Sequence, residues 1–424
     1  MAPAGNASLA DWLAYLELLH PKTIELGLER VQAVKQALKL NPDFPLITVG
    51  GTNGKGSTCA YLEAMLMAAG YRVGCYTSPH LLRYNERVRI AGHEVEDADL
   101  CAAFAAIEVA RGDISLSYFE FGTLAALWLF ARAGVAVAVL EVGLGGRLDA
   151  VNAFDADCAI VTSVDIDHTD YLGTTRELIG YEKAGIFRAG RPAICGDLDA
   201  PHSLLQHAAS IGAQLDCVGS VFHFVREATV WHFNGRLTHH DLPNPRMPGA
   251  YQFNNAACAV AALDALRPQL EVSDAAMYQG LRQAQVAGRF QVMPGQPELI
   301  LDVAHNPHAA HALAANLQAR PCQGKTLALW AMLSDKDIAG VAAAMVDVVD
   351  IWLVAGLAVP RGAATEQLMT ALAGSVGEVR SCQNITEAWQ LACELAREND
   401  RICAFGSFYT VARVLQLHHD CPHG

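Results

Sequence analysis

Charged residues are scarce in this sequence, and basic residues are the scarcer kind. Only 17% of the 424 residues are charged, and 30 lysines and arginines stand against 44 aspartates and glutamates. The resulting net charge of −14 excludes a general nucleic-acid-binding protein, which needs a basic surface. A small anionic ligand is not excluded, because a local group of backbone amides binds phosphate even on an acidic protein.

Long apolar runs and paired cysteines are also missing. The longest apolar run, residues 124–140, is interrupted by Arg132 and Gly134, so it falls short of the roughly 20 apolar residues of a membrane-spanning helix. No basic segment followed by an apolar one marks a secretion signal. The twelve cysteines include no CxxC pair, which predicts reduced thiols. We therefore expect a cytoplasmic protein without a membrane partner.

Short apolar segments alternate with helical patterns through most of the chain. Residues 44–50, 135–142 and 158–163 have the composition of buried parallel strands. Segments with helical spacing, such as residues 58–69 and 121–133, lie between these strands. This order predicts an α/β fold with a parallel central sheet.

Two changes in pattern predict the domain organisation. The pattern changes between about residues 213 and 247, where residues 221–225 and 229–233 read as short antiparallel strands with a hairpin turn signal at Asn234-Gly235. The helical pattern stops at residues 290–297, and a second alternating series of strands and helices follows. We therefore predict a first domain over residues 1–290 and a smaller, Rossmann-like α/β domain over residues 297–424.

A glycine-rich turn joins the first predicted strand to a helix. It consists of Gly50, Gly51, Thr52, Asn53, Gly54, Lys55, Gly56 and Ser57. Its backbone amides and the helix N-terminus would hold phosphate, Lys55 would reach the β- and γ-phosphates, and Ser57 would offer a hydroxyl to Mg²⁺. Gly56 separates Lys55 from Ser57, which departs from the usual phosphate-loop spacing. The turn predicts a P-loop ATPase domain; the alternative is a glycine-rich turn without a ligand.

Further segments carry a family resemblance. They read CYTSPHLLRYNERVR at 75–89, EVGLGGRLDAVN at 141–152, TSVDIDHTDYLG at 162–173, EKAGIF at 182–187, GRFQ at 288–291, DVAHNP at 302–307 and GSFYT at 406–410. With the G-T-N-G-K-G-S loop and in this order, they resemble the Mur-ligase superfamily. Within it, the sequence is similar to the folylpolyglutamate synthase family and its bifunctional dihydrofolate synthase members, from about residue 12 to about residue 415.

The resemblance implies an ATP-dependent ligase. Its expected substrates are L-glutamate with 7,8-dihydropteroate or with reduced folates such as tetrahydrofolate. A carboxylate is a poor electrophile, so it would first attack the γ-phosphate of ATP, and the glutamate amine would then attack the acyl phosphate. Both steps gather negative oxygens, so catalysis would depend on positioning and on cations. Nothing in the sequence marks a large apolar surface, so a monomer is the expected state.

The resemblance also implies two Mg²⁺ sites. Ser57, Ser78 and Glu141 would bind the first cation, with Glu141 at the carboxyl end of a strand where α/β sheets bind ligands. His168 would bind the second, although nitrogen is an unusual ligand for this cation. Lys183 is expected to be carbamylated and to supply an oxygen at the same place.

Lys55, His168 and Lys183 are thus the predicted catalytic residues. For two of the residues predicted near the metal, a role that does not involve the metal is the alternative. Glu141 could be a strand-end carboxylate without a metal, and Lys183 could be an unmodified lysine paired with a phosphate or with Glu182.

The resemblance assigns the remaining ligand contacts. Asn255 would bind adenine, and Arg289, Asp302 and His305 would bind the nucleotide from the junction and the second domain. For Arg289 the alternative is a salt bridge between domains. Ser407 would lie at the glutamate site. The pterin side would be formed by His20, Pro21, Lys22, Thr23, Ser117, Tyr118, Phe119, Glu120, Leu148, Asp149 and Ala150.

Three other functions compete with this interpretation. A Mur-type ligase for a cell-wall precursor would carry a nucleotide-sugar domain before the phosphate loop, where only about 45 residues stand. A P-loop GTPase would carry an N-K-x-D motif, which is missing. A non-catalytic folate-binding relative would not need Lys55, Glu141 and His168 together.

Overall fold

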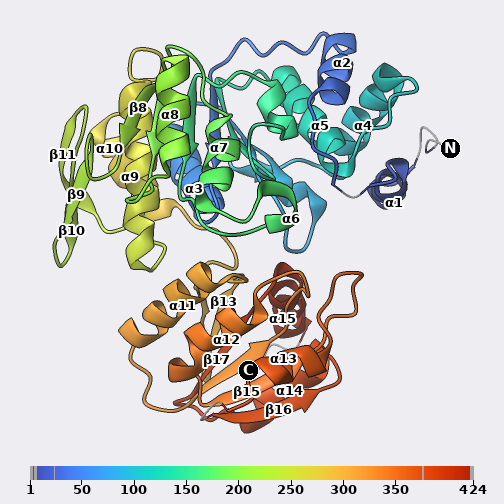
Figure 1. Cartoon of the computed structure of the whole chain (residues 1–424), viewed down its shortest axis with the longest axis vertical. Helices are drawn as coiled ribbons and strands as arrows, with labels where there is room; N and C mark the ends of the chain where they lie inside the picture. The colour runs from blue at the N-terminus through green and yellow to red at the C-terminus, as the bar shows by residue number, and fades with distance from the viewer. Residues whose placement is uncertain (1–2, 4–6, 23, 375–376, 421–424) are drawn as a thin grey trace. The chain divides into compact units, whose positions relative to one another are not determined.

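The computed structural model describes residues 3, 7–22, 24–374 and 377–420 (Figure 1). The chain forms two compact units. The first comprises Met1–Arg246 and Gln252–Gln285, and the second comprises Met247–Tyr251 and Val286–Gly424. Residues 247–251 thus belong to the second unit. The chain then returns to the first unit at Gln252–Gln285, and it belongs to the second unit again from Val286 onward.

An eight-stranded sheet forms the centre of the first unit. Its strand order is β4-β3-β2-β5-β1-β6-β7-β8. The strands are β1 Leu46–Gly50, β2 Val73–Tyr76, β3 Val88–Ile90, β4 His93–Glu94, β5 Val137–Glu141, β6 Cys158–Val161, β7 Pro192–Cys195 and β8 Gln214–Cys217. Six neighbouring strands of this order, β2, β5, β1, β6, β7 and β8, pair in parallel. The strands β3 and β4 pair antiparallel at one edge. The predicted α/β fold with a parallel central sheet is therefore confirmed.

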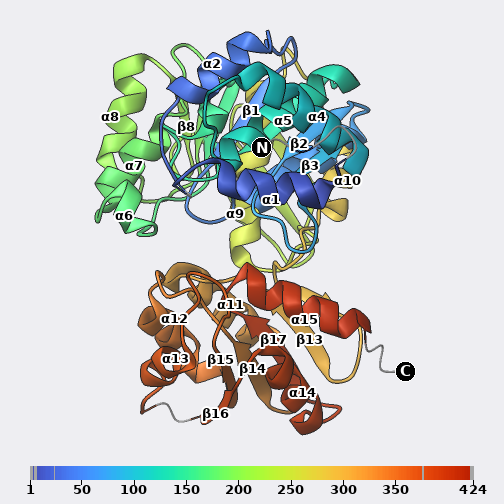
Figure 2. The ribbon, with the colours of Figure 1, turned by 90° about the vertical axis from the view of Figure 1, so that its right-hand side faces the viewer.

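The helices of the first unit lie around this sheet, some directly on it and others on neighbouring helices (Figures 1 and 2). They are α1 Leu9–Leu19, α2 Glu29–Ala37, α3 Lys55–Ala68, α4 Asp97–Arg111, α5 Tyr118–Ala133, α6 Thr169–Leu172, α7 Arg176–Ala184, α8 His202–Ile211, α9 Ala250–Ala265 and α10 Asp274–Gln283, with 3₁₀ turns at Tyr84–Arg87 and Ala150–Ala153. Leu46 of β1 and Leu140 of β5 join the apolar cluster of α1, α2, α4 and α5. Because neighbouring side chains of a strand point to opposite faces, Ile47 and Val49 face the other way, and α3 packs on β1, β2 and β5.

The antiparallel strands predicted at residues 221–225 and 229–233 are confirmed. The strands β9 His223–Arg226, β10 Val230–Asn234 and β11 Thr238–Pro243 form a separate sheet in the order β11-β10-β9. The turn at Gly235 joins β10 to β11, as the Asn-Gly signal predicts. The preceding segment, Gln214–Cys217, is the last parallel strand of the large sheet.

The second unit has a six-stranded sheet of its own. Its order is β12-β13-β17-β14-β15-β16, from β12 Gln291–Met293, β13 Glu298–Asp302, β14 Thr326–Trp330, β15 Ile351–Ala355, β16 Glu378–Cys382 and β17 Arg401–Phe405. Only β12 is antiparallel. The helices are α11 Pro307–Ala319, α12 Ile338–Met345, α13 Thr365–Ala371, α14 Ile385–Leu395 and α15 Phe408–Asp420, with a 3₁₀ turn at Val346–Val348. Three buried rings, Trp330, Trp352 and Phe405, form its centre with centroids 5.2 to 6.2 Å apart. This is the predicted Rossmann-like α/β unit.

No helix in the described part of the chain combines the length and apolar character needed to cross a membrane. The longest apolar run of the sequence, residues 124–140, is divided between α5, which ends at Ala133, and the buried strand β5.

The contact between α3 and α10 generates the first prediction. A Cβ added at Gly280 of α10 would lie 2.6 Å from the backbone nitrogen and 2.7 Å from the Cα of Met65 in α3. Gly280→Ala gains about 1 kcal/mol of helix propensity, but pushing two backbones apart costs more. We expect a net loss of about 1–2 kcal/mol in the free energy of unfolding, measured by chemical denaturation. Gln279→Ala, on the exposed side of the same helix, is the control and should change stability by less than about 0.5 kcal/mol.

Candidate functional site

The glycine-rich turn lies between the buried strand β1 and helix α3. Gly54 caps α3 in the left-handed conformation, with φ 89°. A Cβ added there would lie 2.3 Å from the Oδ1 atom of Asn255, and one added at Gly51 would lie 1.9 Å from the Oγ1 atom of Thr162. The missing side chains therefore allow the turn to lie directly against α9 and the end of β6.

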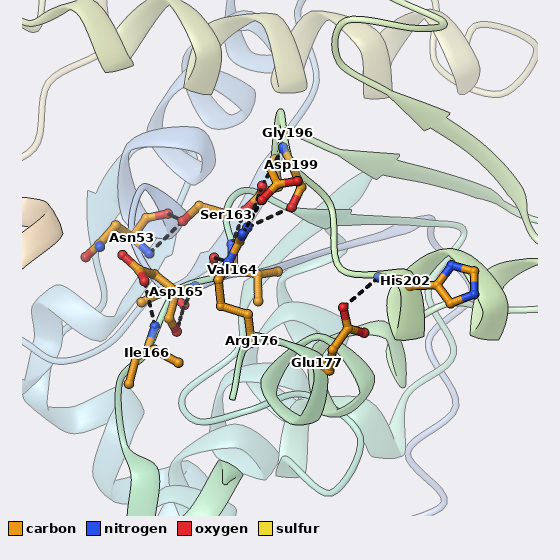
Figure 3. Close-up of polar contacts among 12 residues, drawn as sticks. Asn53, Ser163, Val164, Asp165, Ile166, Arg176, Glu177, Gly196, Asp199 and His202 are labelled. Carbon is orange, nitrogen blue, oxygen red and sulfur yellow. Dashed lines mark hydrogen bonds and ion pairs between the residues drawn. The ribbon is translucent and has the colours of Figure 1, made fainter. Parts of the chain in front are cut away.

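The segment after β6 holds the turn in place. The backbone N–H of Thr52 donates to the carbonyl of Ser163 at 2.8 Å. The Thr52 hydroxyl donates to the carbonyl of Asp165 at 3.1 Å and accepts from the Asp165 N–H at 2.9 Å. The N–H of Asn53 donates to the Ser163 hydroxyl at 3.1 Å (Figure 3). The sequence analysis did not assign Ser163 or Asp165 a role, although both lie in the motif at 162–173 that carried the resemblance.

Arg176 at the start of α7 clamps that segment to the end of β7. Its Nε donates to the carbonyl of Val164 at 3.0 Å, and its other nitrogens contact Asp197 at 3.0 Å and Asp199 at 2.6 Å (Figure 3). Asp197 in turn accepts from the N–H of Val164 at 2.6 Å. Arg176 is thus a further functional candidate that the sequence did not indicate, because its partners come from two separate segments, at Val164 and at Asp197 with Asp199.

Two lysines belong to this site. The Nζ atom of Lys55 donates to the carbonyls of Gly51 at 2.9 Å and Thr52 at 3.1 Å. Lys183 of α7 is buried, and this burial, together with the nearby positive charge of Lys55, lowers the pKa of its amine to about 7. The negative charge of Asp167 opposes part of that shift. At neutral pH a substantial fraction of the Lys183 amine, about half, is therefore uncharged, and the uncharged form is a nucleophile.

Oxygen donors gather at the carboxyl ends of β2 and β5. Glu141 is buried at the end of β5, and one carboxylate oxygen accepts from the N–H of Ser78 at 3.1 Å. Both carboxylate oxygens lie 3.8 Å from where a Cβ of Gly56 would stand, and Ser57 is the next residue of that helix. Carboxylate and hydroxyl oxygens are the ligands that Mg²⁺ prefers, so the three residues predicted for the first cation fit it chemically.

His168 occupies a different local setting. It has a left-handed backbone, with φ 52°, at the start of the short helix α6. Its ring Nε2 atom lies 3.9 Å from one carboxylate oxygen of Asp167, and the backbone N–H of His168 donates to the other Asp167 oxygen at 2.8 Å. Among the described residues, no group of three histidines, cysteines, aspartates or glutamates is arranged to hold a metal ion.

The predicted pterin residues fall into two groups. In the first, polar side chains hold the fold. Ser117 and Glu120 cap α5 reciprocally, with the Ser117 N–H donating to Glu120 at 2.7 Å. Arg30 contacts Glu120 at 3.2 Å and Glu25 at 3.1 Å, and His20 contacts Glu25 at 2.6 Å. Pro21 and Lys22 are exposed beside this network, and Thr23 lies outside the described residues.

In the second group, apolar and carboxyl surfaces face one another. The Phe119 ring lies 5.8 Å from the Tyr76 ring and against Gly143, where a Cβ would come within 2.6 Å. Asp149 is buried next to this loop and accepts from the N–H groups of Leu144 at 2.9 Å and Val151 at 3.0 Å. Burial raises the pKa of Asp149 to about 7. Leu148 and Ala150 flank this carboxyl in the chain.

An aromatic and cationic cluster beside Tyr118 was also missed. The Arg87 guanidinium lies 5.2 Å from the Tyr84 ring centre and 5.4 Å from that of Tyr118. Its Nε donates to the Nδ1 atom of His80 at 2.9 Å, which leaves the ring proton of His80 on Nε2. The quoted motif at 75–89 contains all three residues outside α5, but their sequence spacing does not reveal that they converge on Tyr118.

In the second unit, Asp302 organises the loop that carries Arg289. It is buried and accepts from the N–H groups of Phe290 and Ala304, both at 2.8 Å. Burial raises the pKa of Asp302, although the positive charge of Arg289 opposes the shift. The Arg289 guanidinium lies 5.4 Å from the Phe408 ring centre, and His305 contacts the Val303 carbonyl through Nδ1 at 2.8 Å.

Ser407 has a structural role that the sequence did not indicate. Its hydroxyl accepts from the N–H of Thr410 at 3.0 Å and contacts the Thr410 hydroxyl at 2.7 Å. It therefore caps the first turn of α15. A ligand at this position would meet the helix N-terminus as well as the hydroxyl.

Comparisons with known proteins agree with this geometry. Residues 49–263 match the Mur ligase middle domain, and residues 288–408 match the Mur ligase glutamate ligase domain. The chain therefore belongs to the Mur-ligase superfamily. The curated dihydrofolate synthase/folylpolyglutamate synthase of Escherichia coli (strain K12) is 49% identical over 98% of this chain and 96% of its own length.

Solved structures match equally well. The E. coli FolC structure in complex with DHPP and ADP aligns with a TM-score of 0.94 and 48% identity over 99% of both chains. A bifunctional folylpolyglutamate synthase/dihydrofolate synthase with Mn, AMPPNP and L-glutamate bound aligns with a TM-score of 0.92 and 50% identity, over 99% of this chain and 100% of that one. The chain belongs to the dihydrofolate synthase/folylpolyglutamate synthase family, as its motifs predict.

The Arg176 clamp generates the second prediction. Arg176→Ala removes the bonds to Val164 and Asp197, so the segment that positions Thr52 and Asn53 loses a support. We expect affinity for an adenine nucleotide to fall about fivefold, the effect of one hydrogen bond, measured by titration calorimetry.

Arg236→Ala is the matched control. The Arg236 side chain is 37% exposed and pairs with Asp216, whereas that of Arg176 is 34% exposed and pairs with Asp197. Both variants should lose similar stability, but only Arg176→Ala should weaken nucleotide binding. An equal loss of affinity in both would show that the clamp acts through stability alone.

Proposed function

We propose that this chain is an ATP-dependent ligase that adds L-glutamate to 7,8-dihydropteroate and to tetrahydrofolates. The observation that carries the proposal is the buried Lys183 beside Lys55 at the glycine-rich turn, with its amine pKa lowered to about 7 and with the Glu141 carboxylate facing the start of α3. This combination suits phosphoryl transfer to a carboxylate better than simple nucleotide binding. The relatives with bound ADP, AMPPNP, DHPP and L-glutamate support the substrates.

The reaction follows from the chemistry of a carboxylate. An oxygen of the acceptor carboxylate attacks the γ-phosphorus of ATP and ADP leaves. The amine of L-glutamate then attacks the carbonyl carbon of the acyl phosphate, phosphate leaves and the nitrogen loses a proton. In the proposal, residues 52–57 hold the triphosphate, with Lys55 turning from the loop carbonyls to the β- and γ-phosphates. Asn255 binds adenine, and Arg289, Asp302 and His305 are the nucleotide contacts of the second unit.

Two Mg²⁺ ions complete the proposal. Ser57, Ser78 and Glu141 would hold the first, and His168 and carbamylated Lys183 the second. Bound there, the cations would neutralise charge that develops on the phosphate oxygens. The fit is better for the first set, whose donors are all oxygens; for the second, a carbamate on Lys183 supplies the oxygen that the unmodified amine lacks.

The acceptor and glutamate sites are proposed from the remaining residues. The partly exposed rings of Tyr118 and Phe119 offer flat faces to a pterin, and Asp149 offers a buried carboxyl close to them. His20, Pro21, Lys22, Thr23, Ser117, Glu120, Leu148 and Ala150 complete this side as the family resemblance assigns it. Ser407 remains our candidate for the glutamate site, and we propose that the enzyme acts as a monomer.

Acceptor choice generates the third prediction. With ATP, Mg²⁺, bicarbonate and L-glutamate, we expect phosphate release with 7,8-dihydropteroate and also with tetrahydrofolate. Lys55→Ala should reduce either rate by about 100-fold or more, the scale of losing one charge-stabilising donor, while its circular dichroism spectrum stays unchanged. Turnover with tetrahydrofolate alone would contradict the dihydropteroate assignment, and near-normal rates in Lys55→Ala would contradict the role of the glycine-rich turn.

Lys183 generates the fourth prediction. Only an uncharged amine reacts with CO₂, and the folded pKa of about 7 lies well below the ordinary value for lysine. The uncharged fraction therefore rises as the pH rises through 7. With saturating ¹³C-bicarbonate, we expect the carbamate carbon signal to be larger at pH 8 than at pH 6 in nuclear magnetic resonance spectra.

Lys183→Arg keeps a positive charge but forms no carbamate. It should show no such carbon signal, and its turnover should fall by about 100-fold. If the protein that retains Lys183 shows no carbamate signal at either pH, the proposed carbamylation is contradicted.

A further inference from the structure

A fully buried glutamine connects the metal side of the site to the nucleotide side. Gln252 has no exposed surface and lies on α9. Its Nε2 atom donates to the hydroxyl of Ser57 at 3.3 Å. Its Oε1 atom accepts from the Nδ2 atom of Asn255 at 3.1 Å and from the hydroxyl of Tyr61 at 3.4 Å. Neither the sequence analysis nor the family resemblance assigned this residue a role.

The donors around Gln252 decide how its amide is oriented. The Nδ2 group of Asn255 has only hydrogens to offer, so it needs an acceptor, and only the Oε1 end of the amide is one. The Nε2 end then faces Ser57. If the amide were turned over, two N–H groups would oppose each other at Asn255. The contact to Asn255 therefore determines which atom Ser57 meets.

The orientation of the amide in turn determines what the Ser57 hydroxyl can bind. A hydroxyl oxygen has two lone pairs and one hydrogen. One lone pair accepts the Gln252 N–H, so the other lone pair is available to a cation and the hydrogen to a phosphate oxygen. This is the arrangement that a hydroxyl ligand of Mg²⁺ requires.

The hydrogen bond between Gln252 and Asn255 also orients the amide of Asn255. Because Nδ2 of Asn255 donates to Gln252, its Oδ1 atom points to Gly54, where a Cβ would come within 2.3 Å of it. Gly54 and Ser57 lie three residues apart at the start of α3, and Gln252 and Asn255 lie three residues apart on α9. The start of α3 and α9 thus meet at two places, Ser57 with Gln252 and Gly54 with Asn255, which include one predicted cation ligand and one predicted adenine ligand.

We infer that Gln252 is a positioning residue that couples cation binding at Ser57 to nucleotide binding at Asn255. This inference rests on the proposed function, which assigns those two ligand roles. Gln252 touches neither ligand in it. It keeps the Ser57 lone pair directed to the cation and the Asn255 carbonyl oxygen directed to the loop, so that each ligand finds its site already arranged.

Calorimetric titration of ADP, with saturating Mg²⁺ or with a chelator, tests this coupling. The ratio of the two affinities is the Mg²⁺ enhancement. Gln252→Met keeps the length and volume of the side chain and removes both hydrogen-bonding ends. We expect it to reduce the enhancement about tenfold, since partners of metal ligands act on that scale, and to reduce the affinity measured with chelator by only about threefold. In a Ser57→Ala background, the effect of Gln252→Met on the enhancement should disappear.

Controls separate coupling from packing. Gln214→Met removes a glutamine amide on β8 that bonds only to the Gly190 carbonyl, and it should leave the enhancement unchanged. Thermal melting of every variant reports stability separately. An unchanged enhancement in Gln252→Met overturns the inference, whether or not its melting temperature falls, because a residue that only packs changes stability alone. An equal effect of Gln252→Met with and without Ser57 also overturns it.

The test is independent of the acceptor. ADP binding needs neither pterin nor glutamate, so absence of phosphate release with both acceptors would count against the proposed function alone. If the protein without substitutions binds ADP equally well with Mg²⁺ and with chelator, the inferred coupling is overturned, because Gln252 would then have no cation site to support.

Discussion

The structure of the site depends on one close approach, that of the glycine-rich turn to its neighbours. Gly51 and Gly54 have no side chains where a Cβ would collide with Thr162 or Asn255. The turn can therefore bond along its length to the segment after β6, through Thr52 and Asn53. Asn255, Ser163 and the start of α3 therefore all meet at this turn, so the proposed nucleotide and cation contacts share one support.

Burial of charged and ionisable groups is the second constraint. Lys183, Glu141 and Asp149 are all buried in the first unit, near the ends of its strands. An isolated buried charge is costly, so such groups either find partners or change protonation. Glu141 accepts from Ser78, whereas Lys183 and Asp149 have pKa values moved to about 7. The same desolvation that lowers stability thus prepares an uncharged amine and a protonatable carboxyl for chemistry.

Sequence reasoning succeeded where a function depends on adjacent residues. The turn at residues 50–57 needs its glycines, lysine and serine in succession, and the alternating apolar segments need only local periodicity. It failed where partners come from distant segments. Arg176 contacts both the 162–165 segment and Asp197, and Arg87 lies over Tyr118; no spacing in the sequence links these residues.

The sequence by itself determined the fold class, the family and the residue types of the site, because strand and helix periodicity and the order of the motifs are properties of the linear chain. Tertiary structure decided which atom each residue presents. Lys183 is a buried amine with its pKa lowered to about 7, and the buried Gln252 donates to the hydroxyl of Ser57. Those properties arise from burial and from hydrogen bonds between segments up to 195 residues apart, so they exist only once the chain has folded.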